Sequence, residues 1–209
     1  MLLSVNGYES DSCIAKSDKL KFTSAMQKSL SDEQLMLHYA KGDASAFEQL
    51  YARHKGGLYR YCLRQLNNQA RAEECFQDIW MKLVNSRVNY QPKALFTTYL
   101  YRIAQNHIID IIRKEKKLSQ ETELEEEFHS SLVGDNRTDI ADELIEKRQF
   151  QQLRQQIEQL PMEQKTAVLL KMDAGLSLED ISNVLNCGRE TVKSRLRYAT
   201  ARLKNLLGE

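Results

Sequence analysis

Hydrophobic side chains recur every three or four residues through residues 32–117, which is the repeat of an amphipathic helix. Residues typical of turns and helix ends divide this stretch. Gly42 ends the first predicted helix, Asp43 is placed to cap the second, and the pair Asn67-Asn68 separates the second from the third. Four helices are therefore predicted: one over about residues 32–41, one between the cap at Asp43 and the Asn67-Asn68 turn, and two over about residues 70–85 and 96–117.

The fourth helix has the clearest pattern, with apolar side chains along one face from Phe96 to Ile111. His107 falls on this face, so we expect it to belong to the core. A polar loop through Tyr90 and Pro92 precedes the helix. The apolar face of the third helix is formed by Ala72, Phe76, Ile79, Trp80 and Leu83.

The repeat fails over residues 118–139, where carboxylates, serines and Gly134 give the composition of a solvated linker. Helical pattern resumes at about residue 140. We therefore predict an all-α protein with two small helical domains, over residues 31–117 and 140–209, joined by this flexible acidic linker. Residues 1–30 are polar and aperiodic, and we expect a poorly ordered extension.

The second domain contains residues that typically start and end several short helices. Pro161 fits the first position of a helix that ends before Gly175. Ser177 then caps a short helix, with Asp180 three residues further on, in the spacing of a capping box. The turn Asn186-Cys187-Gly188 follows, and Arg189 opens the last helix.

The last two helices have the order and polarity of a helix-turn-helix. On the final helix Val192, Leu196, Ala199 and Leu203 share one face, which can pack against Ile181, Val184 and Leu185 of the helix before it. The opposite side carries Glu190, Lys193, Ser194 and Arg197, which can hydrogen-bond to bases or phosphates. Arg195 and Arg202 flank this side, where phosphate contact is the expected role.

The distribution of charged residues along the chain adds to this picture. The chain has 209 residues and a formal net charge of +1, which alone says nothing about nucleic acid. Acidic residues gather in the linker, whereas the last helix is basic. The four cysteines have no CxxC spacing and the four histidines form no cluster, so neither a disulfide framework nor a zinc site is indicated.

No signal peptide and no apolar run of membrane-spanning length is apparent in the sequence, and we expect a cytoplasmic protein without membrane insertion. Gly-rich phosphate loops and nucleophile–base motifs are also missing from the sequence. We therefore expect neither catalysis nor a cofactor.

Two separate stretches resemble one family. Residues 160–196, with the string ETVKSRL, are similar to the sigma-4 domain of bacterial sigma factors of the extracytoplasmic-function (ECF) group in the sigma-70 superfamily. Residues 32–117 resemble the sigma-2 domain of the same group, through Gly42-Asp43, Ala72-Glu73-Glu74 and the string FTTYLYRIAQNHIIDIIR from Phe96. This resemblance implies a subunit that binds core RNA polymerase and directs it to promoters.

The resemblance also implies a role for three groups of residues. The minus-35 element would be read by the last helix, through Arg189, Glu190, Thr191, Lys193, Ser194, Arg195 and Arg197. The minus-10 element would be bound and opened by Arg102, Asn106, Asp110, Arg113 and Lys114, with Tyr90 stacking on a flipped base. The clamp helices of the polymerase would dock on Glu74, Gln77, Asp78 and Met81, a stripe that an ordinary solvated helix face also resembles.

Further partners are implied by the family. They are the polymerase flap, promoter DNA, and an anti-sigma factor clasped between the two domains of a protein that is monomeric when free. The acidic linker suits a basic channel of the polymerase, but a plain solubilising linker has the same composition.

A conventional helix-turn-helix regulator is the alternative to a sigma factor. Such a regulator would bind duplex DNA tightly without polymerase, and it would need a ligand pocket or a dimer interface. The match over residues 72–113 argues against it.

Overall fold

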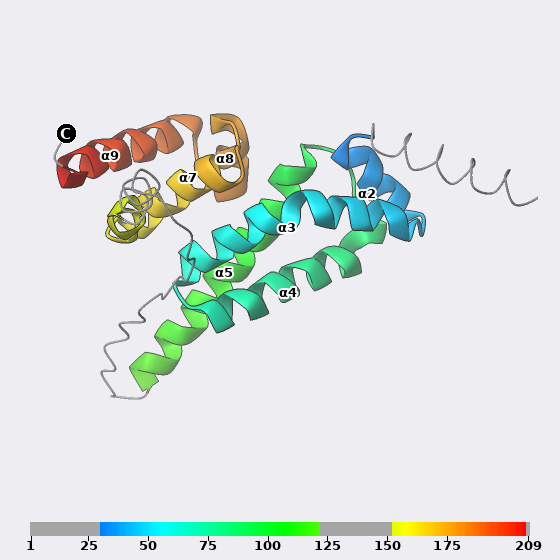
Figure 1. The fold of residues 1–209 in the computed structure, drawn as a ribbon, viewed down its shortest axis with the longest axis horizontal. Coiled ribbons are helices and arrows are strands. Elements are labelled where there is room, and N and C mark those ends of the chain that lie inside the picture. Colours follow the sequence, from blue (N-terminus) through cyan, green and yellow to red (C-terminus); the bar gives the residue numbers. More distant parts are fainter. Residues whose placement is uncertain (1–29, 122–151, 208–209) are drawn as a thin grey trace, which may run out of the picture.

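The computed structural model describes residues 30–121 and 152–207 (Figure 1). Regular structure in these two ranges is entirely helical, which confirms the predicted all-α class. The predicted N-terminal extension up to residue 29, the linker from residue 122 and the helical pattern at 140–151 lie outside the described residues. No helix in the described ranges has the length and apolar character needed to cross a membrane.

The N-terminal domain, residues 30–121, is a bundle of four α-helices. A short 3₁₀ helix, η1, lies between the last two. The elements are α2 (Asp32–Ala40), α3 (Ala44–Leu66), α4 (Gln69–Ser86), η1 (Arg87–Asn89) and α5 (Phe96–Glu121). Helix α5 continues to Glu121, into residues that the sequence pattern assigned to the linker.

Side-chain caps fix the helix starts in this domain. Ser31 and Gln34 form a capping box at α2, Asp43 accepts a hydrogen bond from the backbone N–H of Ser45, and Asn68 caps α4. Asn67 ends α3 in the left-handed conformation, with φ of 51°. The turn residues of the sequence therefore have the structural roles that their chemistry predicts.

The core of the N-terminal domain lies where the apolar faces of α3, α4 and α5 meet. Leu50, Leu58, Ile79, Leu83 and Leu100 are completely buried. A cluster of aromatic rings around Trp80 adds to this core. The ring of Tyr51, at the outer side of this cluster, is open to solvent. The side chain of Tyr51 is 36% exposed, and its ring packs at a tilt on Trp80 with ring centroids 5.0 Å apart.

The C-terminal domain comprises the helical residues 152–158 and three further helices, α7 (Met162–Asp173), α8 (Leu178–Leu185) and α9 (Arg189–Leu207). Pro161 is the N-cap of α7 and not its first helical residue, a difference of one position. Gly175 has φ of +66°, which suits glycine. Ser177 and Asp180 form the predicted capping box at α8, and Asn186 makes the left-handed turn before α9.

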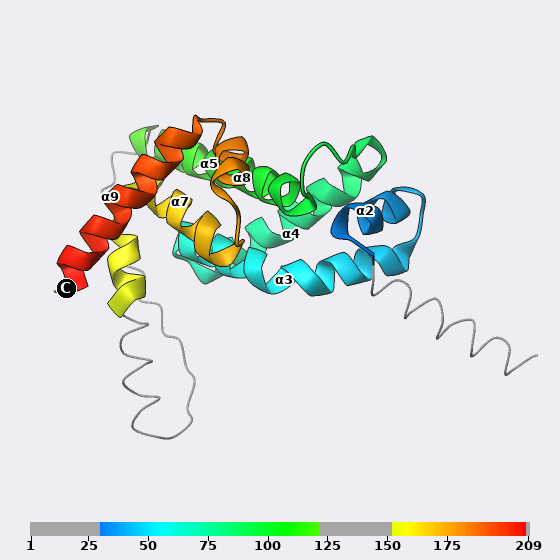
Figure 2. The ribbon, with the colours of Figure 1, turned by 90° about the horizontal axis from the view of Figure 1, so that it is seen from above.

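The two domains are in direct contact. Helix α7 lies against α3, and α8 lies against α5, as the view from above shows (Figure 2). The helix-turn-helix therefore packs on the N-terminal domain through its first helix, and α9 lies on the outside of the molecule.

Candidate nucleic-acid interface

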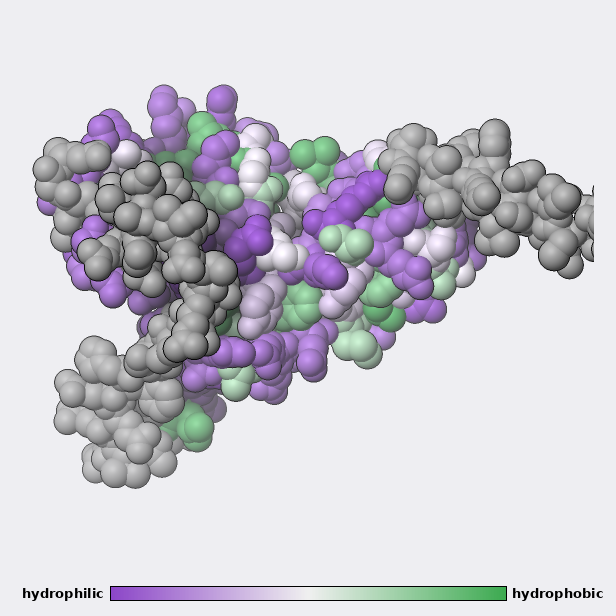
Figure 3. Space-filling model, in the orientation of Figure 1, coloured by the Kyte–Doolittle hydropathy of each residue, from purple (hydrophilic) through white to green (hydrophobic). Residues whose placement is uncertain are grey.

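Helix α9 presents a basic face to solvent and an apolar face to its own domain. Val192 and Ala199 are completely buried against α7 and α8. Arg189, Lys193 and Arg197 are exposed, and Lys193 lies 3.6 Å from the carboxylate of Glu190, one turn before it. Hydrophilic side chains dominate this end of the surface (Figure 3). The separation of an apolar packing face from an exposed polar face agrees with the sequence prediction.

Arg195 has partners inside its domain. Its guanidinium donates a hydrogen bond to the Glu163 carboxylate at the start of α7 and makes a longer contact of 3.6 Å with the sulfur of Cys187. The sequence predicts Arg195 on the flank of the binding side, as a phosphate contact. In the structure it links the turn and α7 to the recognition helix, and its side chain is 22% exposed.

Helix α5 has a second polar surface along its length. Arg102, Asn106 and Asp110 lie one turn apart and are exposed, while the intervening Ala104 and Ile108 are buried. Arg113 and Lys114 extend the exposed row with two cations. Five of the residues predicted for the minus-10 element therefore lie on the open side of one helix.

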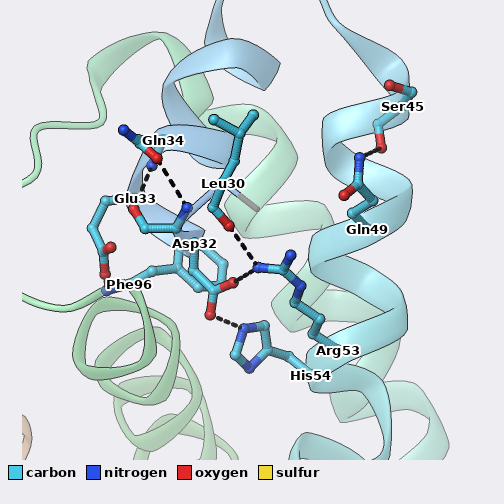
Figure 4. Close-up of polar contacts among 10 residues, drawn as sticks. Leu30, Asp32, Glu33, Gln34, Ser45, Gln49, Arg53, His54 and Phe96 are labelled. Atoms are coloured by element: carbon cyan, nitrogen blue, oxygen red, sulfur yellow. Dashed lines mark hydrogen bonds and ion pairs between the residues drawn. The ribbon is translucent and has the colours of Figure 1, made fainter. Parts of the chain in front are cut away.

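The start of α5 is held by α2. Glu33 accepts a hydrogen bond of 2.8 Å from the backbone N–H of Phe96, a group that the helix itself leaves without a partner (Figure 4). Next to it, Asp32 accepts hydrogen bonds from Arg53 at 2.6 Å and His54 at 2.7 Å. The bond from His54 is the main cause of a lowered pKa at Asp32, and burial opposes it.

Tyr90 does not share the surface of the α5 row. Its side chain is 7% exposed, and its ring packs on Tyr99 with centroids 5.1 Å apart. Burial also raises the pKa of its phenol to about 12. In this conformation the ring is not open to a base, contrary to the expectation from sequence. The large exposed apolar side chains of this region are instead Val88 and Leu95.

The polar stripe on α4 is present as predicted. Glu74, Gln77 and Met81 are exposed, and Met81 has 56% of its surface free. Asp78 is exposed too, but its carboxylate lies 3.0 Å from Nε2 of His107 on α5. His107 is therefore only partly a core residue, because its polar edge reaches the surface of α4.

Several polar residues at the domain contact were not singled out in the sequence. Thr98 donates to Asp180, Gln65 donates to Thr166, and Arg64 pairs with Asp173. Two features of the sequence point to this contact between the domains. Asp173 places a carboxylate at a helix C-terminus, where the helix dipole disfavours it, and Gly56-Gly57 weakens the middle of α3.

The described parts of the chain contain neither a cluster of metal-ligating side chains nor a disulfide. No group of three or more His, Cys, Asp or Glu side chains within those ranges is arranged to hold a metal ion. Cys62, Cys75 and Cys187 are free thiols, and the first two are buried. Cys13 lies outside the described residues.

Together, these features define the class of protein. Two helical domains each present a polar, partly basic helix, and one of these helices belongs to a helix-turn-helix whose binding face is open. This is a DNA-binding protein with two separate candidate contact surfaces.

Comparison with known proteins identifies the family. Residues 50–118 match the model of sigma-70 region 2, and residues 150–203 match that of sigma-70 region 4. The ECF RNA polymerase sigma factor SigW of Bacillus subtilis is 31% identical over 172 residues, which are 80% of this chain and 91% of SigW. The ECF sigma factor SigM of Mycobacterium tuberculosis is 28% identical, with 85% of each chain covered.

Solved structures agree on the fold. The sigma factor RpoE of Bartonella quintana, crystallised with the anti-sigma factor NepR, gives a TM-score of 0.66 at 23% identity, over 78% of this chain and 96% of RpoE. CnrH, in complex with the cytosolic domain of CnrY, gives a TM-score of 0.63 at 21% identity, over 85% and 97% of the two chains.

The chain belongs to the ECF group of sigma-70 family RNA polymerase sigma factors. It is a DNA-binding transcription initiation factor that works with core RNA polymerase at promoters. The family is one of non-enzymatic initiation factors. The match of both regions excludes the alternative of a conventional helix-turn-helix regulator.

Proposed function

We propose a division of labour among three surfaces, each defined by exposed residues on one helix. The minus-35 surface is the outer side of α9, the minus-10 surface is the α5 row, and the polymerase surface is the α4 stripe. The proposed polymerase and minus-10 domain is residues 31–117, as predicted from the sequence, lengthened by the end of α5 to Glu121, and the proposed minus-35 domain is residues 140–209.

The minus-35 surface consists of exposed side chains backed by buried ones. Lys193 and Arg197 have the length and charge to reach base edges and phosphates, while Val192 holds the helix against its domain. Arg195 contributes by positioning the helix through Glu163. The complete surface comprises the exposed Arg189, Glu190, Thr191, Lys193 and Arg197, with the half-buried Ser194 and Arg195 at its edge.

The minus-10 surface and the polymerase surface belong to adjacent, connected helices. Asp78 on α4 pairs with His107 on α5, and Arg71 on α4 pairs with Glu115 on α5. A polymerase docked on α4 would therefore hold α5 in a fixed orientation, in which Arg102, Asn106, Asp110, Arg113 and Lys114 face separated DNA strands. This coupling of α4 to α5 is the observation that carries the proposal.

The remaining parts of the proposal rest on the relatives. The protein acts in the cytoplasm as a monomer with no cofactor, and the polymerase supplies the chemistry. An anti-sigma factor holds it when transcription is not required, as with RpoE, which was crystallised with NepR. In the polymerase the C-terminal domain contacts the flap.

Transcription with purified components tests the proposal. The protein is added to core polymerase on genomic DNA, and transcript starts are sequenced. Starts that share two sequence elements at constant spacing are expected, and core polymerase alone is the control. Random starts at the level of core alone would refute the function. A shared minus-35 element that persists after Lys193→Ala and Arg197→Ala are combined would refute the assignment to α9.

A further inference from the structure

Two arginines of α9 are held in different ways, although they lie close together on one helix. Arg195 is bound inside its domain by Glu163 and Cys187, and only 22% of its side chain is exposed. Arg197 is exposed, and it lies one turn after Lys193 on the outer side of the helix. The guanidinium of Arg197 is therefore on the face that is open to a ligand, whereas that of Arg195 is bound to its own domain.

Tyr198, the next residue along α9, contacts the guanidinium of Arg197. Cζ of Arg197 lies over the ring of Tyr198, 5.0 Å from the ring centroid, which is within the range of a cation–π interaction. Nη2 of Arg197 also donates a hydrogen bond of 3.3 Å to the hydroxyl of Tyr198. Because Tyr198 is 57% exposed, burial in the core does not account for an aromatic residue at this position.

These contacts restrict Arg197 without occupying all of its donors. A guanidinium has five N–H donors in one plane, and the hydroxyl of Tyr198 accepts from one of them. Stacking on a ring uses the face of the guanidinium, so the other N–H groups, which point outward in its plane, stay available to a ligand. A side chain that is ordered before binding also loses less conformational freedom when it binds. Tyr198 therefore prepares Arg197 for a planar ligand with two acceptors.

Lys193 has a different arrangement on the same face. Its ammonium group lies 3.6 Å from the carboxylate of Glu190, and it is a point charge on a flexible stem. A point charge attracts phosphates as well as bases, whereas two parallel N–H donors match the O6 and N7 acceptors of guanine in the major groove. Of these two exposed cations, Arg197 therefore has the geometry better suited to one particular base.

We propose that Arg197 and Tyr198 form a specificity-determining pair, in which Arg197 reads one guanine of the minus-35 element and Tyr198 positions Arg197. This inference rests on the assignment of α9 to that element under Proposed function. Arg197 is the residue that contacts the base, and Tyr198 acts only through Arg197. The pair sets which base is preferred at one position, and the other contacts of the minus-35 surface supply the remaining affinity.

NMR spectroscopy of the free full-length protein tests the contact without any functional assumption. An aromatic ring shifts the resonances of protons above its face upfield, so the side-chain Nε–H proton of Arg197 should resonate upfield of an ordinary exposed arginine. Loss of this resonance in Arg197→Lys identifies it. Tyr198→Phe should keep the upfield shift, and Tyr198→Leu should abolish it. The same resonance position in the parent and in Tyr198→Leu would overturn the positioning role of Tyr198.

Base preference is tested with the holoenzyme on promoter DNA in which the minus-35 element is randomised, and the bound DNA is sequenced. Arg197→Lys keeps the charge but removes the planar fork, so it should lower the preference for guanine at one position by about tenfold. Tyr198→Leu should lower the preference at the same position by about two- to fivefold, which is the contribution of an exposed cation–π contact. Tyr198→Phe keeps the ring and should retain most of the preference.

Arg202→Lys is the matched control, because it makes the same substitution on the flank of α9, where phosphate contact is expected. This control should leave the base preference at every position unchanged. An unchanged profile in Arg197→Lys, or an equal loss of affinity for all four bases, would overturn the reading of guanine by Arg197. The parent profile in Tyr198→Leu would overturn the role of Tyr198 alone. A parent holoenzyme that selects no minus-35 sequence would instead refute the proposed function of α9, whatever the NMR spectra show.

Discussion

The two helices assigned to promoter DNA are held in different ways. Helix α5 contributes Phe96, Leu100, Ala104 and Ile108 to a core, each at most 1% exposed, and α2 caps its start. On α9, which is seven residues shorter, Val192 and Ala199 are buried to the same degree, and the rest of its apolar face is half-buried.

The difference in burial has a mechanical meaning. In the role proposed for it, α5 would hold separated strands against DNA that tends to re-anneal, and burial along the helix would supply the resistance that this needs. A helix that reads intact duplex needs a correct face and a fixed start, which the Asn186 turn and Arg195 provide. We infer that α5 depends on its core, whereas α9 depends on its local contacts.

Truncation of one leucine in each helix tests this comparison with the largest expected effect. Leu100→Ala should lower the free energy of unfolding by about 2–5 kcal/mol, since Leu100 is completely buried. Leu196→Ala should cost clearly less, because Leu196 is half-buried and its site can refill with water. Urea denaturation followed by circular dichroism measures both. Equal losses would show that the two helices are held alike.

Removal of single charges separates the three surfaces by function. Lys193→Ala should weaken binding of the holoenzyme to the minus-35 element by about 1–3 kcal/mol and leave core association unchanged. Glu74→Lys should weaken association with core polymerase instead. Glu74 is a better choice than Asp78, because a change at Asp78 would also remove its contact with His107. Binding is measured with labelled promoter DNA and labelled core. Loss of core binding in both variants would contradict the assignment.

The sequence predicted helices and caps more fully than contacts between domains. Asp43 and Ser177, the two caps predicted from the sequence, act through atoms only two or three residues away, so local chemistry was sufficient. The bond from Thr98 to Asp180 joins residues 82 positions apart, and no local pattern encodes it. The burial of Tyr90 likewise depends on Tyr99, which lies on a helix beyond the intervening loop.

Two capping boxes, one in each domain, give a smaller test. Ser177→Ala removes the cap of α8, and Ser31→Ala removes that of α2; each should cost about 1 kcal/mol. Ser177 also hydrogen-bonds the Asp180 carboxylate that Thr98 reaches from the other domain. Ser177→Ala should therefore also expand the free protein in X-ray scattering, and Ser31→Ala should not. Expansion in neither variant would mean that the cap does not support the interface.

The smallest predicted effect is a loss of stability of the N-terminal domain in acid, through Asp32. Hydrogen bonds from His54 and Arg53 lower the pKa of Asp32 below its ordinary value of 3.8, against the opposing effect of burial. A carboxyl whose pKa is lower in the folded protein than in the unfolded chain stabilises the folded state at any pH above its ordinary pKa. This stabilisation is lost as pH falls through the pKa of the folded protein. Stability of the N-terminal domain should therefore fall below about pH 4.

The neutral variant Asp32→Asn isolates that contribution from the general effect of acid. It should be less stable than the parent at pH 6, and the gap should narrow as pH falls below 3.8. Asp110→Asn, on the exposed side of α5, is the control for removal of a carboxylate outside the contacts of Arg53 and His54. Urea midpoints at pH 3–6 measure all three proteins. A gap for Asp32→Asn that does not change with pH would show that shape, and not charge, ties α2 to α3 beside the start of α5.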